Sequence, residues 1–79
     1  METYQNQTMS SRQRVNSSSL ASIGYDPVSW TLDVEFRKGG VYRYSGVLPQ
    51  VYQMLMLAPS KGRFFIAQIR DRFLYSRVC

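Results

Sequence analysis

Thr31-Leu-Asp-Val-Glu-Phe-Arg37 is the stretch that decides the fold, and it continues through Lys38-Gly-Gly40 into Val41-Tyr-Arg-Tyr-Ser45. Apolar and polar side chains alternate along the first segment, with the period of two that a β-strand requires. The two glycines then permit a tight reversal of the chain. The whole stretch therefore predicts one β-hairpin.

The register of this hairpin follows from its apolar side chains. A two-residue loop would place Val34 opposite Arg43 and interrupt the apolar face. A three-residue loop over Lys38-Gly-Gly40, with Gly40 at a positive φ, keeps the apolar side chains together. This register predicts that Phe36 lies opposite Tyr42, Val34 opposite Tyr44, and Glu35 opposite Arg43 as a charge pair on the solvent face.

Further elements are predicted on both sides of the hairpin. Pro49 suits the first position of a helix that is apolar nearly all round and so should be buried on more than one side. Ser60 is a suitable N-cap for a second helix. The expected order is a strand over 19–25, a turn over 26–29, the hairpin, helices over 49–57 and 61–70, and a closing strand over 73–78. The predicted fold is α+β: an antiparallel sheet of three to four strands, a meander plus a short C-terminal strand, packed by two helices.

The length of 79 residues indicates one small domain. Residues 1–16 are rich in Ser, Gln and Asn and predict a flexible arm, followed by a domain over 17–79. The single cysteine, Cys79, allows no internal disulfide. No apolar run is long enough for a secretory signal or a membrane span, so we expect a cytoplasmic protein that does not bind a membrane.

Ten Lys and Arg residues against five Asp and Glu give a formal charge of +5. The excess gathers between Lys61 and Arg77, where Asp71 is the one acidic residue. Such a local excess favours an anionic partner, either nucleic acid or an acidic protein surface. The alternative is that these side chains only solvate exposed faces of the fold.

Ser60-Lys61-Gly62-Arg63 is the most site-like segment, because free amides, a hydroxyl and two cations meet at one helix start. An ordinary N-cap with a solvated first turn explains it equally well. Arg43 could reach a phosphate from the solvent face, or could simply pair with Glu35. The predicted nucleic-acid-binding residues are Arg43, Ser60, Lys61, Gly62, Arg63, Arg70, Arg72 and Arg77.

Tyr42 and Tyr44 have two readings, as base-stacking platforms or as core residues. The hairpin register favours the core. The chain has no histidine and no paired carboxylates in a suitable pattern, so we expect no catalysis, no cofactor and no metal.

Seven segments of the chain match one family pattern in order and spacing: Ser17-Ser-Ser19, Ile23-Gly-Tyr-Asp26, Leu32-Asp-Val-Glu-Phe36, Val41-Tyr-Arg-Tyr44, Ser60-Lys-Gly62, Ile69-Arg70 and Tyr75-Ser-Arg-Val78. Through them the chain resembles the KTSC domain family, which occurs at the C-terminus of some lysyl-tRNA synthetases and as stand-alone bacterial and phage proteins. The resemblance spans Ser17 to Val78. Ile66 and Asp71 depart from it, since the family commonly has Asn and Gly there. The resemblance implies a small α+β domain and, through the synthetases, RNA binding.

Together these observations predict a non-catalytic module that binds nucleic acid, RNA above all, through phosphate contacts of its basic helix and tail. The alternative is a protein-interaction module, or a small phage-encoded inhibitor that acts on a partner protein. A third reading is a homo-oligomer that forms through the apolar first helix or an unpaired sheet edge.

Overall fold

The computed structural model describes residues 11–79. In this part of the chain, five antiparallel strands form one sheet in the order β2-β3-β4-β5-β6, so every strand lies beside its neighbours in the sequence. The α+β prediction is confirmed, with five strands in place of three or four. The strands are β2 (Gln13–Arg14), β3 (Leu20–Asp26), β4 (Thr31–Phe36), β5 (Val41–Tyr44) and β6 (Tyr75–Arg77).

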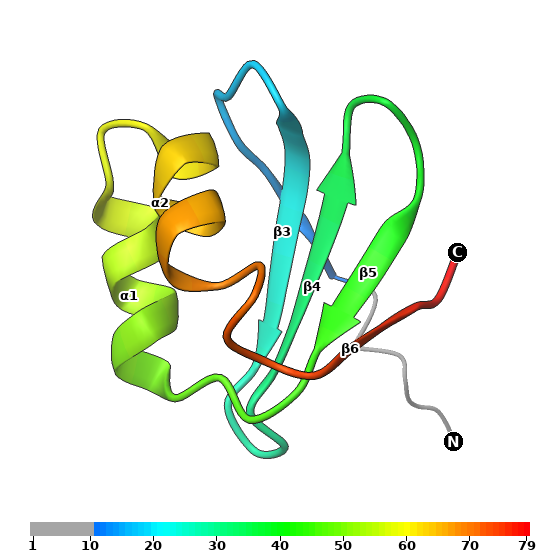
Figure 1. Cartoon of the computed structure of the whole chain (residues 1–79), viewed down its shortest axis with the longest axis vertical. Helices are drawn as coiled ribbons and strands as arrows, with labels where there is room; N and C mark the ends of the chain where they lie inside the picture. The colour runs from blue at the N-terminus through cyan, green and yellow to red at the C-terminus, as the bar shows by residue number, and fades with distance from the viewer. Residues whose placement is uncertain (1–10) are drawn as a thin grey trace.

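Two helices, α1 (Pro49–Leu57) and α2 (Lys61–Gln68), lie between β5 and β6 in the sequence. Pro49 occupies the first turn of α1, and the Ser60 hydroxyl accepts a hydrogen bond from the backbone N–H of Arg63 at 3.3 Å. Figure 1 shows both helices on one side of the sheet, with the chain after α2 crossing to β6 at the far edge. The two helices were therefore correctly predicted.

The hydrophobic core lies between the helices and the sheet. Leu32 and Val34 of β4 are fully buried there. The Phe65 ring of α2 lies 5.4 Å from the Phe36 ring and 5.3 Å from the Tyr44 ring, in edge-to-face contacts. The prediction that the apolar side chains of the hairpin share one face is confirmed. The buried cluster comprises Leu20, Ile23, Leu32, Val34, Tyr44, Val47, Leu55, Phe65 and Ile69.

The predicted register of the hairpin was wrong, because the observed strand pairing is shifted from it by two residues. The Phe36 amide donates to the Gly40 carbonyl, and the Gly39 amide donates to the Phe36 carbonyl. The loop therefore has three residues, as predicted, but it starts at Arg37 rather than Lys38. The Arg37 amide instead donates to the carbonyl of Ser19, the residue that precedes β3. The observed pairs are Leu32 with Tyr44, Asp33 with Arg43, Val34 with Tyr42 and Glu35 with Val41.

A polar network covers the sheet face away from the helices. Arg43 makes a two-pronged ion pair with Asp33, at 2.8 and 3.0 Å, and the Asp33 side chain is only 5% exposed. The Ser22 hydroxyl donates to a Glu35 carboxylate oxygen at 2.8 Å and accepts from Arg12 Nε at 3.0 Å. Glu35 therefore pairs with Ser22, and Arg43 pairs with Asp33, in place of the predicted pair of Glu35 with Arg43.

The sheet begins earlier than the predicted domain start at residue 17. Gln13 and Arg14 form β2 and pair with Ile23 and Ser22 of β3. Residues 1–10 of the predicted flexible arm lie outside the described residues.

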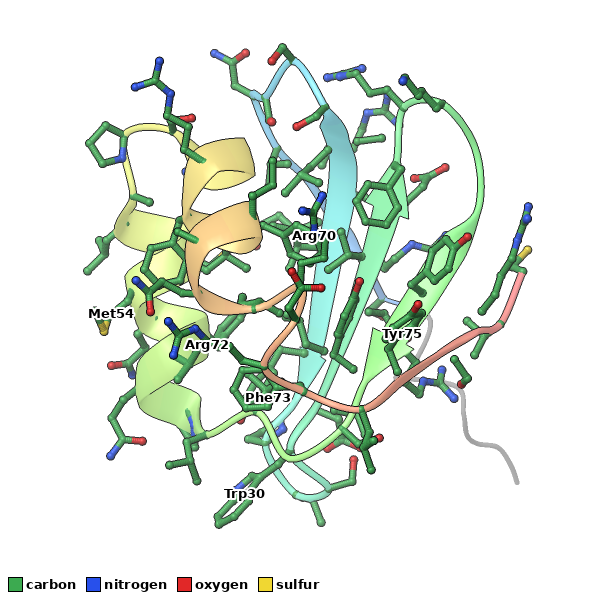
Figure 2. All side chains as sticks on the ribbon, viewed as in Figure 1. Trp30, Met54, Arg70, Arg72, Phe73 and Tyr75 are labelled. Carbon is green, nitrogen blue, oxygen red and sulfur yellow. The ribbon has the colours of Figure 1, made fainter. Side chains whose placement is uncertain are left out.

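Helix α1 was expected to be buried on more than one side, and this was wrong. Leu55 is its one fully buried residue. Met54 and Leu57 are 57% and 83% exposed, and Figure 2 shows Met54 pointing away from the rest of the molecule. The helix covers the core with one face only and presents apolar side chains to solvent on another.

Candidate functional site

An open cleft of about 550 Å³ separates α2 from the half of the sheet that the helices leave uncovered. Its volume falls within the range of small-ligand sites. Figure 2 shows Arg70 between α2 and the sheet, with Tyr75 across from it on β6. The cleft is lined by Ser18, Ser19, Leu20, Phe36, Arg37, Lys38, Gly39, Tyr42, Tyr44, Gly62, Phe65, Ile66, Arg70, Asp71 and Tyr75.

Aromatic rings form the floor of the cleft on β4, β5 and β6. The Tyr75 ring lies 5.9 Å from the Tyr42 ring and 5.4 Å from the Tyr44 ring. Tyr75 is 58% exposed, Tyr42 is half-buried, and Tyr44 is buried. Burial, followed by the charges that Tyr75 and Tyr42 can carry, raises the pKa of Tyr44 to about 12. Tyr44 is therefore a core residue, and Tyr42 and Tyr75 offer ring surface to a ligand.

Cationic side chains stand around this aromatic floor. Lys38 lies at the hairpin end of the cleft, and Arg70 lies on the α2 side, 55% exposed, with Asp71 as a distant ion-pair partner at 3.8 Å. The guanidinium of Arg77 lies 5.9 Å above the centre of the Tyr42 ring. Arg37 also lines the cleft, and its Nε donates to the Ser17 carbonyl at 2.6 Å.

The segment Ser17 to Ser19 closes the end of the cleft beside α2. The Ser17 hydroxyl accepts hydrogen bonds from the amides of Ser19 and Leu20 and so fixes a tight turn before β3. A Cβ atom at Gly62 would lie 2.5 Å from the Ser19 hydroxyl oxygen. Glycine at position 62 therefore lets the first turn of α2 approach the serine segment closely.

The structure gathers only part of the predicted site. Gly62 and Arg70 line the cleft, and Arg77 lies beside Tyr42. Ser60, Lys61 and Arg63 lie at the start of α2 and do not line it; the Lys61 ammonium donates to the Ala58 carbonyl at 3.3 Å. Arg72 donates to the Ala67 carbonyl at 3.2 Å and points away from Tyr75 in Figure 2. Arg43 lies on the opposite sheet face, held by Asp33.

Sequence reasoning missed Lys38 and Tyr75 as site residues. The signal for Tyr75 was present, because a closing strand beside β5 brings its aromatic side chain next to the two hairpin tyrosines. The signal for Lys38 was its place in a hairpin loop next to an aromatic face. To recognise either residue as part of the site required the strand order, which the sequence did not specify. Ile66 and Asp71, the two departures from the family pattern, also line the cleft.

Two further findings concern the described residues, 11–79. Within them, no helix is long and apolar enough to cross a membrane. The same residues hold no group of three or more His, Cys, Asp or Glu side chains placed to bind a metal ion.

The fold and cleft define a small α+β domain whose five-stranded meander carries two helices on one face. Residues 16–73 match the model of the KTSC domain, and the chain belongs to that family. The crystal structure of a KTSC domain protein from Yersinia pestis superimposes with a TM-score of 0.84 at 46% identity, covering 86% of this chain and 96% of that one.

Relatives by sequence are of two kinds. An uncharacterized protein of Stutzerimonas stutzeri is 52% identical over 54 residues, which cover 68% of this chain and 76% of that protein. A lysine–tRNA ligase of Nostoc sp. is 36% identical over 59 residues, which cover 75% of this chain but only 10% of the ligase. The domain therefore occurs in proteins of about its own size and as a small part of a much larger enzyme.

Proposed function

We propose that this chain is a non-catalytic module that binds single-stranded nucleic acid, RNA in preference to DNA, in the cleft beside α2. The observation that carries the proposal is the joint presence of the exposed Tyr75 ring and the half-buried Tyr42 ring with Lys38, Arg70 and Arg77 around them. Aromatic rings hold unpaired bases by stacking, and cations beside them hold the phosphates.

The geometry favours a single strand over a duplex. Bases in a duplex are stacked on each other and cannot lie on a protein ring unless the helix opens. The rings of Tyr42 and Tyr75 line the cleft beside α2, and a splayed base can reach them there while a base that stays paired in a duplex cannot stack on them.

The preference for RNA rests on the serine segment. Ser18 and Ser19 line the same cleft and present hydroxyl groups that can exchange hydrogen bonds with a ribose 2′-hydroxyl. That hydroxyl is the group by which a protein distinguishes RNA from DNA. The relationship to proteins named lysine–tRNA ligases agrees with an RNA partner.

Fluorescence anisotropy tests the proposal with a labelled single-stranded RNA, the same sequence as DNA, and an RNA duplex, each over a series of salt concentrations. The parent should bind the RNA strand most tightly. Tyr75→Ala should weaken binding about tenfold, because one stacked base is lost. Arg70→Gln should weaken binding to all three probes and lower the log-log salt slope by about one unit.

Arg14→Gln is the matched control, because Arg14 is an exposed arginine on β2, outside the cleft. It should change the affinity much less than Arg70→Gln. Equal effects of the two substitutions would show charge attraction without a site. Absence of binding at low salt would overturn the proposal in favour of a protein partner, for which the exposed Met54 and Leu57 of α1 offer a surface.

A further inference from the structure

We propose that two copies of this chain associate through β6, antiparallel across a two-fold axis at Ser76, to form one continuous sheet. The two edges of the sheet differ in a way that points to this. The β2 edge is blunted, since it is two residues long and consists of exposed Gln13 and Arg14. Short, charged edges are how proteins prevent strand pairing. The β6 edge is also short, with Arg77 as its one charged residue, but it differs from β2 in carrying large exposed apolar side chains.

Large apolar side chains are exposed along the β6 edge. Leu74 is 83% exposed, Tyr75 58% and Val78 43%. In the described part of the chain, no strand pairs with the outer side of β6. A row of exposed apolar residues on an open edge is the usual mark of a strand that pairs with another chain.

The free backbone groups of β6 can be assigned. The Ser45 amide donates to the Leu74 carbonyl, and the Val78 amide donates to the Val41 carbonyl. Because successive residues of a strand point their N–H and C=O groups in opposite directions, those of Leu74, Ser76 and Val78 face β5. The N–H and C=O groups of Tyr75 and Arg77 therefore face outward, available to a further strand.

A two-fold axis at Ser76 gives each of these backbone groups a hydrogen-bond partner in the second copy. It sets Tyr75 opposite Arg77 of the second copy, and Arg77 opposite the second Tyr75, so that each pair exchanges two backbone hydrogen bonds. No two arginines then face each other. Each arginine instead lies beside a tyrosine ring, as Arg77 already does with Tyr42 within one copy.

The same register also pairs the exposed apolar side chains. Leu74 faces Val78 of the second copy on the sheet face away from the cleft, on each side of the two serines. In this register the backbone groups, the charges and the apolar side chains all find matching partners. We therefore infer that the strand that pairs with β6 is that of a second copy of the chain rather than an unrelated strand. Since Tyr75 and Arg77 point toward the cleft face, the two clefts would lie side by side in the dimer.

Sedimentation equilibrium from about 10 µM to about 1 mM tests the association, because the average mass should rise with concentration from 9.2 kDa toward twice that value. Leu74→Lys should raise the dissociation constant about tenfold or more. Leu57→Lys on α1 is the matched control, with the same 83% exposure, and should leave the dissociation constant unchanged. Leu74→Lys with Val78→Glu should recover part of the loss, because the register makes the two new charges partners.

Amide hydrogen exchange identifies the interface. At high concentration the amides of Tyr75 and Arg77 should gain protection, whereas that of Ser76, which faces β5, should be protected at every concentration. A constant mass of 9.2 kDa, a dimer without protection at Tyr75 and Arg77, or an edge filled by a different protein would each overturn the proposal.

Discussion

Tyr44 couples the stability of this domain to pH at the alkaline end. Its ordinary pKa of 10.0 is raised to about 12, chiefly by burial. Between these values the folded chain keeps the phenolic proton and the unfolded chain releases it. The contribution of Tyr44 to the free energy of unfolding is therefore fully present below pH 10 and is lost as the pH rises toward 12.

We expect Tyr44 to contribute about 2 to 3 kcal/mol to this loss. Urea unfolding at pH 9 and near pH 12 measures it, with Tyr44→Phe as the comparison, because phenylalanine has no phenolic proton. The parent should lose more stability between the two pH values than the variant. Equal losses would mean that the Tyr44 hydroxyl is not buried as described.

Arg43 has a structural role that its position in the sequence does not reveal. Replacing it by Ala leaves the nearly buried Asp33 carboxylate without its partner, which should lower the free energy of unfolding by about 3 kcal/mol. Adding Asp33→Asn should restore part of the lost free energy of unfolding, since this substitution removes the uncompensated charge. Chemical denaturation checks both variants, and a cost for Arg43→Ala below about 0.5 kcal/mol, typical of surface residues, would contradict the ion pair's role.

At the scale of elements, α2 is fitted against the serine segment through Gly62. Alanine in a helix is favoured over glycine by about 1 kcal/mol, but here its Cβ would collide with the Ser19 hydroxyl. In a Ser19→Ala background, Gly62→Ala should therefore raise the free energy of unfolding, by at most about 1 kcal/mol because position 62 lies in the first turn of α2. In the parent background the gain should be lost or reversed. A double-mutant cycle measures the coupling, and additive effects would refute the contact.

The two helices, the strands β3 and β4 and the faces of the hairpin could be predicted from the sequence, but the strand β2 and the register of the hairpin could not. A shift by two residues keeps every side chain on the same face, so the alternation of Leu32, Val34 and Phe36 cannot detect it. In the observed register the Arg37 amide donates to the carbonyl of Ser19, the residue before β3, and so Arg37 belongs to the loop. That contact between distant segments has no local signature.

The candidate site was only partly predictable for the same reason. Local chemistry identified Gly62, Arg70 and Arg77, because cations and a helix start are visible in sequence. It also selected Arg43, whose partner became clear only from the strand pairing. Tyr75 was missed as a site residue because its neighbours Tyr42 and Tyr44 lie about thirty residues away and meet it across β5 and β6.

At the scale of the whole molecule, the charge and the aromatic surface are placed together. The helices cover the β3 side of the sheet and leave the β5 and β6 side open, as Figure 1 shows. Part of the net charge of +5 stands around this opening, on Lys38, Arg70 and Arg77. On the opposite sheet face, Arg43 is paired with Asp33, and the Glu35 carboxylate accepts from Ser22. The proposed binding surface is thus the one where ring surface and available cations coincide.

The most direct test of the cleft proposal is an NMR titration of the isotopically labelled chain with a short single-stranded RNA. The amides of Lys38, Tyr42, Arg70 and Tyr75 should show the largest chemical-shift changes, and those of Arg43 and the exposed face of α1 should show little change. Changes centred on α1, or no changes at low salt, would contradict the account.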